Sequence, residues 1–132
     1  MATYTHFYDL PVYKVCRNFR MKVSKVIRDH FPKSEQFLLT AQLLDSSRSV
    51  TANIAEGFGR FHHGENIQHC RISRGSLMES MDHLIIARDD QYIQDELLTE
   101  LNSEYKECLL QLNLYIKYLK EAKKNAKSDK EE

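Results

Sequence analysis

Residues 95–124, DELLTELNSEYKECLLQLNLYIKYLKEAKK, decide the fold of this chain. Their large side chains recur at alternating steps of three and four, which places them on one face of a helix as a heptad seam. Leu97, Leu109 and Ile116 widen that face, so we expect the helix to touch more than one neighbour. At about 1.5 Å per residue, the segment would span about 45 Å. The seam positions are Leu98, Leu101, Tyr105, Cys108, Leu112, Tyr115, Leu119 and Ala122.

The segment before residue 32 predicts a first helix. Asp9 is expected to cap it, and Pro11 suits its first turn because the missing N–H would have no partner there. The helix is expected to end at Phe31, because the residue before Pro32 disfavours helical geometry. Its inward positions, again at steps of three and four, are Val12, Cys16, Phe19, Val23, Val26 and His30.

Two further helices are predicted between residues 34 and 88. Ser34 is the expected cap of the second, and the third is expected from about Glu65 to Arg88, after residues 57–64 interrupt the pattern with glycines and histidines. Gly75 inside the third helix would cost about 1 kcal/mol relative to Ala, which a packing contact that only glycine permits would offset. The inward positions of the second helix are Leu39, Leu43, Ser46, Ser47, Val50, Ile54, Gly57 and Phe58. Those of the third are Ile67, Cys70, Leu77, Met81, Leu84 and Ile85.

These four helices and their short links predict an all-α fold, an antiparallel up-down-up-down four-helix bundle, over residues 1–124. Residues 125–132 carry charges but no apolar anchor, so we expect them to fray. The apolar stripes of the first and fourth helices are too broad for a seam alone, which favours self-association. No apolar run approaches the roughly 20 residues that a bilayer requires, and no secretory signal is evident. With three widely spaced cysteines, these features favour a cytoplasmic protein without a membrane partner.

Patterns for catalysis and metal binding are missing from the sequence. A di-iron bundle needs Glu-x-x-His on two helices, and this pattern does not occur. The group His62, His63, His69 and Cys70 matches no established zinc spacing. Residues 57–59 follow a predicted helix rather than a strand, unlike a phosphate-binding loop. We therefore predict no enzyme activity, no catalytic residue, no cofactor and no metal.

Charged residues flank the small-residue stretches of the second and third helices. If these helices run antiparallel, Arg48 or Arg74 can meet Glu56 or Glu79 across the contact. Such pairs would form an internal ion-pair network that fixes the register, which is the interpretation we favour. The alternative is an arginine-lined contact for an anion or RNA. The full set is Arg48, Glu56, Arg60, Arg71, Arg74 and Glu79.

Basic side chains gather at two places, although the formal net charge is zero. Residues 1–33 carry seven basic and two acidic side chains, whereas residues 95–116 carry one basic and five acidic. Basic clusters suit phosphate contacts, although a run of charge is more often a solvated face. The candidate nucleic-acid contacts are Lys14, Arg17, Arg20, Lys22, Lys25 and Arg28 and, near the end of the fourth helix, Lys117, Lys120 and Lys124, with Lys123 and Lys127 beside them.

Two stretches resemble a known bacterial family. Residues 48–60, RSVTANIAEGFGR, are similar to its signature segment, in which Asn53 is a motif position. Residues 74–79, RGSLME, are similar to its second motif. The family is that of the 23S rRNA intervening-sequence proteins, also labelled S23 ribosomal proteins, which is related to the accessory variability determinant proteins of diversity-generating retroelements. The resemblance spans roughly residues 7–120.

The resemblance implies a four-helix bundle that assembles as a homopentameric barrel. Some relatives partner a reverse transcriptase and bind nucleic acid through a basic surface. Our leading hypothesis is therefore a non-enzymatic oligomeric adaptor that binds RNA or DNA, a nucleic-acid-handling protein such as a reverse transcriptase, or both. The alternative is a purely protein-binding oligomeric scaffold, in which the basic first helix pairs with the acidic residues 95–116 of a neighbouring subunit.

Overall fold

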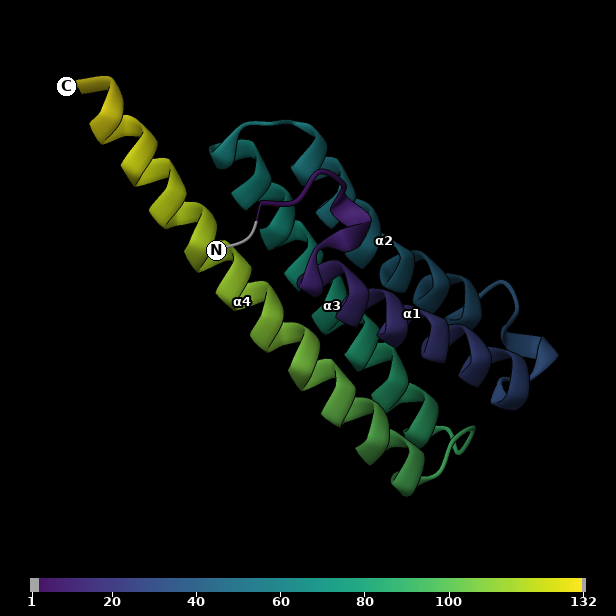
Figure 1. Ribbon diagram of the computed structural model, residues 1–132. Coiled ribbons are helices and arrows are strands. Elements are labelled where there is room, and N and C mark those ends of the chain that lie inside the picture. Colours follow the sequence, from purple (N-terminus) through teal and green to yellow (C-terminus); the bar gives the residue numbers. More distant parts are fainter. Residues whose placement is uncertain (1–2, 132) are drawn as a thin grey trace.

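The computed structural model describes residues 3–131, with side chains described for residues 3–127. Its four helices are α1 (Pro11–His30), α2 (Leu39–Gly59), α3 (His63–Asp89) and α4 (Asp95–Glu131), as Figure 1 shows. Each helix packs on the next, and α4 returns to pack on α1. Within residues 3–131 there is no strand, so the expected all-α four-helix bundle is confirmed.

The first two helices begin differently from the sequence prediction. Pro11 is the first residue of α1, as predicted, but the N-cap is Leu10, because Asp9 belongs to a short 3-10 turn (Phe7–Asp9) and makes no cap hydrogen bond. The expected cap Ser34 is likewise wrong, because it lies in a second 3-10 turn and α2 begins only at Leu39. The Glu35 carboxylate accepts a hydrogen bond from the Leu39 backbone N–H at 3.1 Å and satisfies the start of α2 instead.

The other helix ends lie close to their predicted positions. Phe31 ends α1. His62 caps α3, where its ring Nδ1 accepts a hydrogen bond from the Glu65 N–H at 3.3 Å. The turn between α3 and α4 contains Gln91 at a φ of 67°, which lets the chain reverse. Helix α4 continues through Glu131, beyond the predicted bundle boundary at residue 124, and the fraying of the charged tail stays a prediction.

The core lies between the four helices and uses most of the predicted inward positions. Two of them are wrong, because His30 is exposed and Ile85 is 36% exposed. The large side chains that are almost wholly buried are Phe19, Leu43, Ile54, Leu77, Leu84, Leu101 and Leu112. The three cysteines are free and buried, as expected for packing residues.

Surplus apolar surface lies on α3 and α4 rather than on α1 and α4. The predicted apolar stripe of α1 is buried in the core, apart from His30. Met21 is the only large apolar side chain that α1 exposes. On the other two helices the exposed large apolar side chains are Ile72, Met78, Ile85, Ile86, Leu110, Leu114 and Tyr118. The expectation of a broad apolar face therefore holds for α4 but is wrong for α1.

Candidate nucleic-acid interface

Serine hydroxyls join α2 to α3 along their contact. The Oγ atoms of Ser46 and Ser80 lie 2.8 Å apart, in a buried position. The Ser49 and Ser76 Oγ atoms are also 2.8 Å apart, and Ser73 donates to the backbone carbonyl of Val50 at 2.6 Å. Small hydroxyl side chains let two backbones approach and still satisfy their own polar atoms. The small-residue stretch of α2 therefore serves helix packing.

The Asn-Ile-Ala-Glu-Gly segment of α2 continues this contact. The Asn53 amide donates to the Ser49 carbonyl at 2.9 Å, so its Oδ1, which lies 3.0 Å from the His69 Nδ1, accepts from that ring. One turn later, a Cβ atom on Gly57 would lie 2.7 Å from the Asn66 Oδ1 and 2.9 Å from the His69 Cβ. Gly57 is thus the glycine that the close approach of α2 and α3 requires.

Gly75 has no such role. A Cβ atom built at this position would have no heavy atom within 4 Å, and the residue is exposed. The helix–helix contact that the sequence predicts for Gly75 is therefore absent, and the glycine at a close helix–helix contact is Gly57.

The arginines and glutamates of the motif do not form the internal network that was favoured. In the described part of the chain, no Arg–carboxylate pair joins α2 to α3. Arg60, the C-cap residue of α2, pairs with Glu56 of the same helix at 3.0 Å, and both side chains are about half exposed. Arg74 donates to the Asn113 Oδ1 on α4 at 2.8 Å. Glu79, on the exposed face of α3, makes no ion pair with the described cations.

Arg48 and Arg71 lie in two separate basic clefts. The cross-helix pairs fail because Arg48 turns towards α1 and Arg74 bonds to Asn113 on α4, away from the contact between α2 and α3.

Part of the predicted basic stripe of α1 is engaged by acids of the same chain. Lys22 forms ion pairs with Glu100 at 2.5 Å and Glu104 at 3.3 Å, both on α4. Partial burial opposes the charge on Lys22, but the hydrogen bonds to both carboxylates outweigh it, so the pKa of Lys22 is raised. Lys25 pairs with Asp29, one turn along α1. These two lysines are thus less available to a phosphate than their neighbours.

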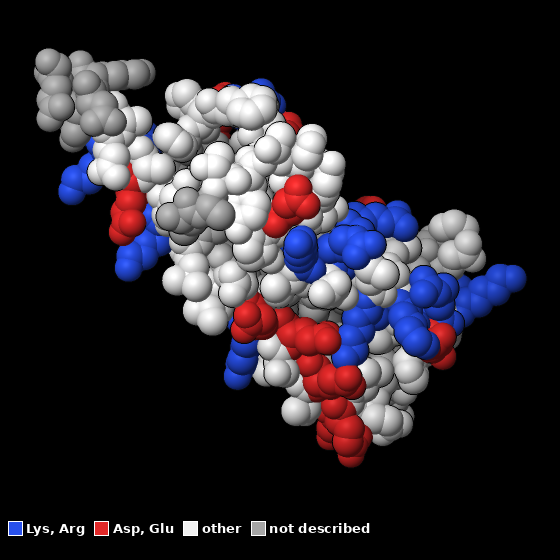
Figure 2. Space-filling view, viewed as in Figure 1, with Lys and Arg blue, Asp and Glu red and all other residues white. Residues whose placement is uncertain are grey.

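The remaining cations of α1 lie on its outward side and towards α2. Figure 2 shows a band of Lys and Arg over α1, beside a band of Asp and Glu over α4. A cleft between α1 and α2 has three guanidinium groups and no carboxylate in its lining, although the Arg20 Nη1 also donates to the Thr51 Oγ1 at 2.7 Å. Its lining residues are Arg20, Met21, Ser24, Arg28 and Arg48. We call this the arginine cleft.

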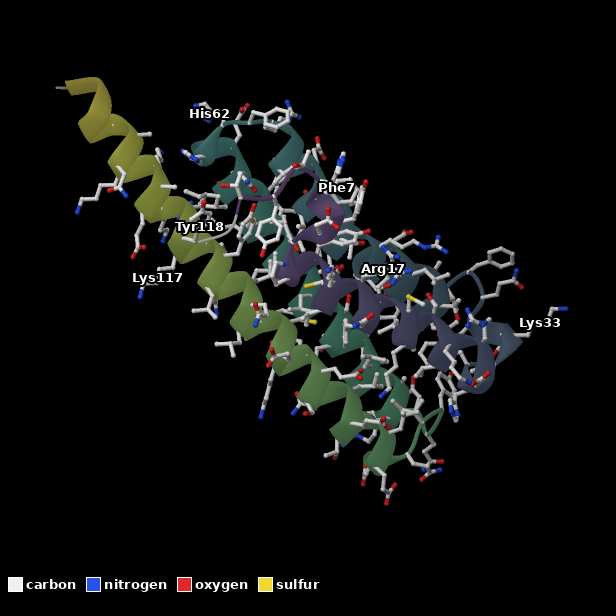
Figure 3. All side chains as sticks on the ribbon, in the orientation of Figure 1. Phe7, Arg17, Lys33, His62, Lys117 and Tyr118 are labelled. Carbon is white, nitrogen blue, oxygen red and sulfur yellow. The ribbon has the colours of Figure 1, made fainter. Side chains whose placement is uncertain are left out.

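Lys14 and Arg17 lie nearer the start of α1, in a shallow hollow that they share with Tyr8, Tyr13 and Asn18. Arg17 is exposed near the middle of the bundle (Figure 3). Cations beside aromatic rings provide a surface that can bind a phosphate and stack on a base.

A second basic cleft lies between α3 and α4. It brings Arg71 of the motif together with Lys120 and Lys124 of the predicted set, and it has no carboxylate in its lining. Lys117, which is exposed, does not line it (Figure 3). The full lining is Gly64, Ile67, Arg71, Lys120, Lys123, Lys124 and Lys127. We call this the lysine cleft.

An aromatic pocket of about 450 Å³ lies where the start of α1, the α2–α3 link and α4 meet. Sequence reasoning missed it, because its walls come from four separate segments and Tyr115 was assigned to the core seam. The clustering of aromatics near the predicted link and the Tyr115/Tyr118 spacing were the available signals. The lining is Thr3, Tyr4, Leu10, Pro11, Val12, Phe58, Phe61, His62, His63, Asn66, Leu114, Tyr115, Tyr118 and Leu119.

Among the described residues, no group of three or more His, Cys, Asp or Glu side chains is placed to hold a metal ion. Within residues 3–131, none of the helices contains an apolar stretch of the length a bilayer crossing needs.

Comparison with known proteins identifies a family and a fold. The model of a family described as "23S rRNA-intervening sequence protein" matches residues 8–114. The fold is similar to a crystal structure of a protein with unknown function from the S23 ribosomal protein family of Bacteroides thetaiotaomicron VPI-5482. The TM-score is 0.73 at 22% sequence identity, over 80% of this chain and 95% of that one. No curated protein matches the chain significantly.

Proposed function

The chain belongs to the 23S rRNA-intervening sequence protein family, and on this premise we propose that it is a non-enzymatic oligomeric adaptor that binds nucleic acid. The observation that carries the proposal is the pair of basic clefts. Together they hold eight Lys and Arg side chains and no carboxylate in their linings. Phosphate contacts from such side chains supply most of the affinity of sequence-independent nucleic-acid binding.

The two clefts come from opposite edges of the bundle, because α1 does not pack against α3 and α2 does not pack against α4. A single strand or duplex could engage both only by crossing the bundle or by bridging neighbouring subunits. Self-assembly would place several copies of each cleft on one particle and raise their joint affinity through effective concentration. This geometry favours an oligomer as the binding form.

The exposed apolar side chains on α3 and α4 supply a surface for that assembly. We propose that the outward face around Met78, Ile86 and Leu110 contacts neighbouring subunits, since such side chains on a small bundle favour association. The subunit number of five follows from the resemblance of the chain to its family. A nucleic-acid-handling enzyme such as a reverse transcriptase is the kind of protein partner that this adaptor would serve, and the cytoplasm is the proposed location.

The alternative, a protein-only scaffold, has less support. It rests on the basic first helix pairing with acidic residues 95–116 of a neighbour. Lys22 already pairs with Glu100 and Glu104 of its own chain, so part of that complementarity is satisfied within one subunit.

The test is an equilibrium binding titration of fluorescent RNA and DNA oligonucleotides at several salt concentrations, with native mass measured on the same samples. We expect an oligomer whose affinity falls steeply with salt, by about 10³-fold between about 50 mM and about 200 mM for six phosphate contacts. An oligomer that binds no oligonucleotide at low salt would support the scaffold instead. A monomer would overturn the oligomeric part of the proposal.

A further inference from the structure

The aromatic pocket differs chemically from the two basic clefts. Its lining has no Lys, Arg, Asp or Glu, and it is dominated by aromatic and aliphatic side chains. The rings of Tyr115 and Tyr118 stack at a centroid distance of 6.3 Å, and those of Phe58 and Phe61 lie 6.2 Å apart. A pocket of about 450 Å³ has the size of a small-molecule site. It suits a flat, uncharged, aromatic group.

The pocket also offers polar atoms for such a group. Asn66 is buried, and its Nδ2 donates to the Tyr115 hydroxyl at 3.2 Å. His62 and His63 are exposed and belong to the lining. Aromatic walls with a few hydrogen-bonding groups are the usual surroundings of an unstacked base in a protein.

Phe61 is held in an unfavourable conformation in the lining of this pocket. Its φ is 51°, in the left-handed region that bulky residues rarely adopt, and its side chain is 87% exposed. Strained backbone of this kind concentrates at functional sites. A buried contact does not account for it, because the ring lies largely in solvent.

The aromatic pocket and the lysine cleft meet at Gly64, the second residue of α3. A Cβ atom at Gly64 would lie 3.3 Å from the Cε1 of His62, which lines the pocket, and 3.3 Å from the Nζ of Lys123, which lines the cleft. An uncharged aromatic pocket thus borders directly on a cleft with five cations. Figure 3 shows His62 and Tyr118 at the same end of the bundle, opposite Lys33.

We propose that the aromatic pocket takes the base of an unpaired nucleotide of a nucleic-acid strand, while the phosphates on one side of that nucleotide lie in the lysine cleft. The inference rests on the proposed function and specifies its ligand as single-stranded. A planar ring joined to an anion fits both halves of this surface. An apolar peptide or a lipid chain would fill the pocket but leave the adjoining cations unexplained.

The test uses a single-stranded oligonucleotide with one 2-aminopurine, whose fluorescence is quenched by stacking, and the same strand with an abasic position instead. We expect quenching on binding, and an affinity about tenfold lower for the abasic strand. The same strand in a duplex should show no added quenching. A nucleoside monophosphate should compete only weakly, because it brings a single phosphate; competition equal to that of the strand would overturn the assignment to a polymer.

Variants separate the pocket from the rest of the surface. Phe61→Ala and Tyr118→Ala should each remove the preference for the intact over the abasic strand, with the salt dependence unchanged. Phe37→Ala is the matched control, since Phe37 is 84% exposed on the α1–α2 link at the other end of the bundle. Salt-dependent binding without quenching and without a preference for the intact strand would overturn the pocket proposal and leave the proposed function standing. Binding to no oligonucleotide would overturn both.

Discussion

The Cβ position of Gly57 on α2 lies 2.7 Å from the Asn66 Oδ1 on α3, closer than a real Cβ atom can approach. The next neighbours, the His69 Cβ at 2.9 Å and the Asn66 backbone oxygen at 3.2 Å, belong to the body of α3 and cannot swing away. Gly57→Ala is therefore expected to lower the free energy of unfolding by about 2 kcal/mol through overpacking.

Gly75→Ala provides the control for that prediction. Nothing lies within 4 Å of a Cβ atom at Gly75, so the helix propensity of Ala should raise the free energy of unfolding by about 1 kcal/mol. Chemical denaturation of both variants measures the two effects, and we expect the dependence of the free energy of unfolding on denaturant concentration to stay unchanged. Equal shifts at the two positions would contradict the close contact at Gly57.

The buried hydroxyl pair Ser46–Ser80 should show energetic coupling. Replacing either serine with Ala leaves the other without its cross-helix partner, at a cost of about 1 kcal/mol each, whereas the double variant removes both polar groups. The double variant is therefore expected to lose clearly less stability than the sum of the single variants. A double-mutant cycle from denaturation curves measures this, and strict additivity would mean that the hydroxyl contact contributes nothing.

Tyr115 should ionise late and make the fold sensitive to alkali. Burial raises its pKa to about 12, although the Asn66 hydrogen bond acts in the opposite direction. Because the folded pKa exceeds the unfolded value of 10.0, the contribution of Tyr115 to stability is complete below pH 10 and is lost as the pH rises towards about 12.

Comparing the phenolate absorbance of the wild type with that of Tyr115→Phe should assign the last-titrating tyrosine. The variant should also lose less stability than the wild type over the same pH range. An unchanged titration curve above pH 10 would place Tyr115 in a more solvated setting than its contacts indicate.

The three thiols should resist alkylation while the protein is folded. The hydrogen-bonded Cys108 thiol and burial both raise the pKa of Cys16, and burial raises that of Cys70 to about 12. Since the thiolate is the reactive form, alkylation at neutral pH should be slow until denaturant is added. Mass spectrometry counts the modified cysteines. Rapid modification of one thiol in the folded state would show that its surroundings open readily.

The sequence predicted what depends on periodicity and missed what depends on how the helices meet. The spacing of Leu98, Leu101 and Leu112 was enough to place α4, because burial of one helix face follows from its own repeat. The caps were missed because capping depends on local backbone angles. The 3-10 turns before α1 and α2 moved those N-caps to Leu10 and Leu38, with the Glu35 carboxylate accepting from the Leu39 N–H, which sequence patterns alone do not reveal.

The candidate site was predicted only in part, for a similar reason. The basic character of α1 and of the end of α4 was visible in the chain, but the clefts depend on the register of neighbouring helices. That register brings Arg48 beside Arg28 and Arg71 beside Lys124. The same register sends Lys22 to the acids of α4 and leaves it unsuited to an outside phosphate.

The central claim, that the two clefts bind phosphate, is tested most directly by the slope of log affinity against log salt for a single strand. We compare the wild type with a variant in which Arg28, Arg48, Lys120 and Lys124 are all Ala, and with Lys106→Ala as a control on the exposed part of α4 outside both clefts. Each phosphate contact contributes about 0.7 to the slope. The quadruple variant should therefore have a slope shallower than that of the wild type by about 2 to 3, and the control should match the wild type. Parallel lines for all three proteins would contradict the account.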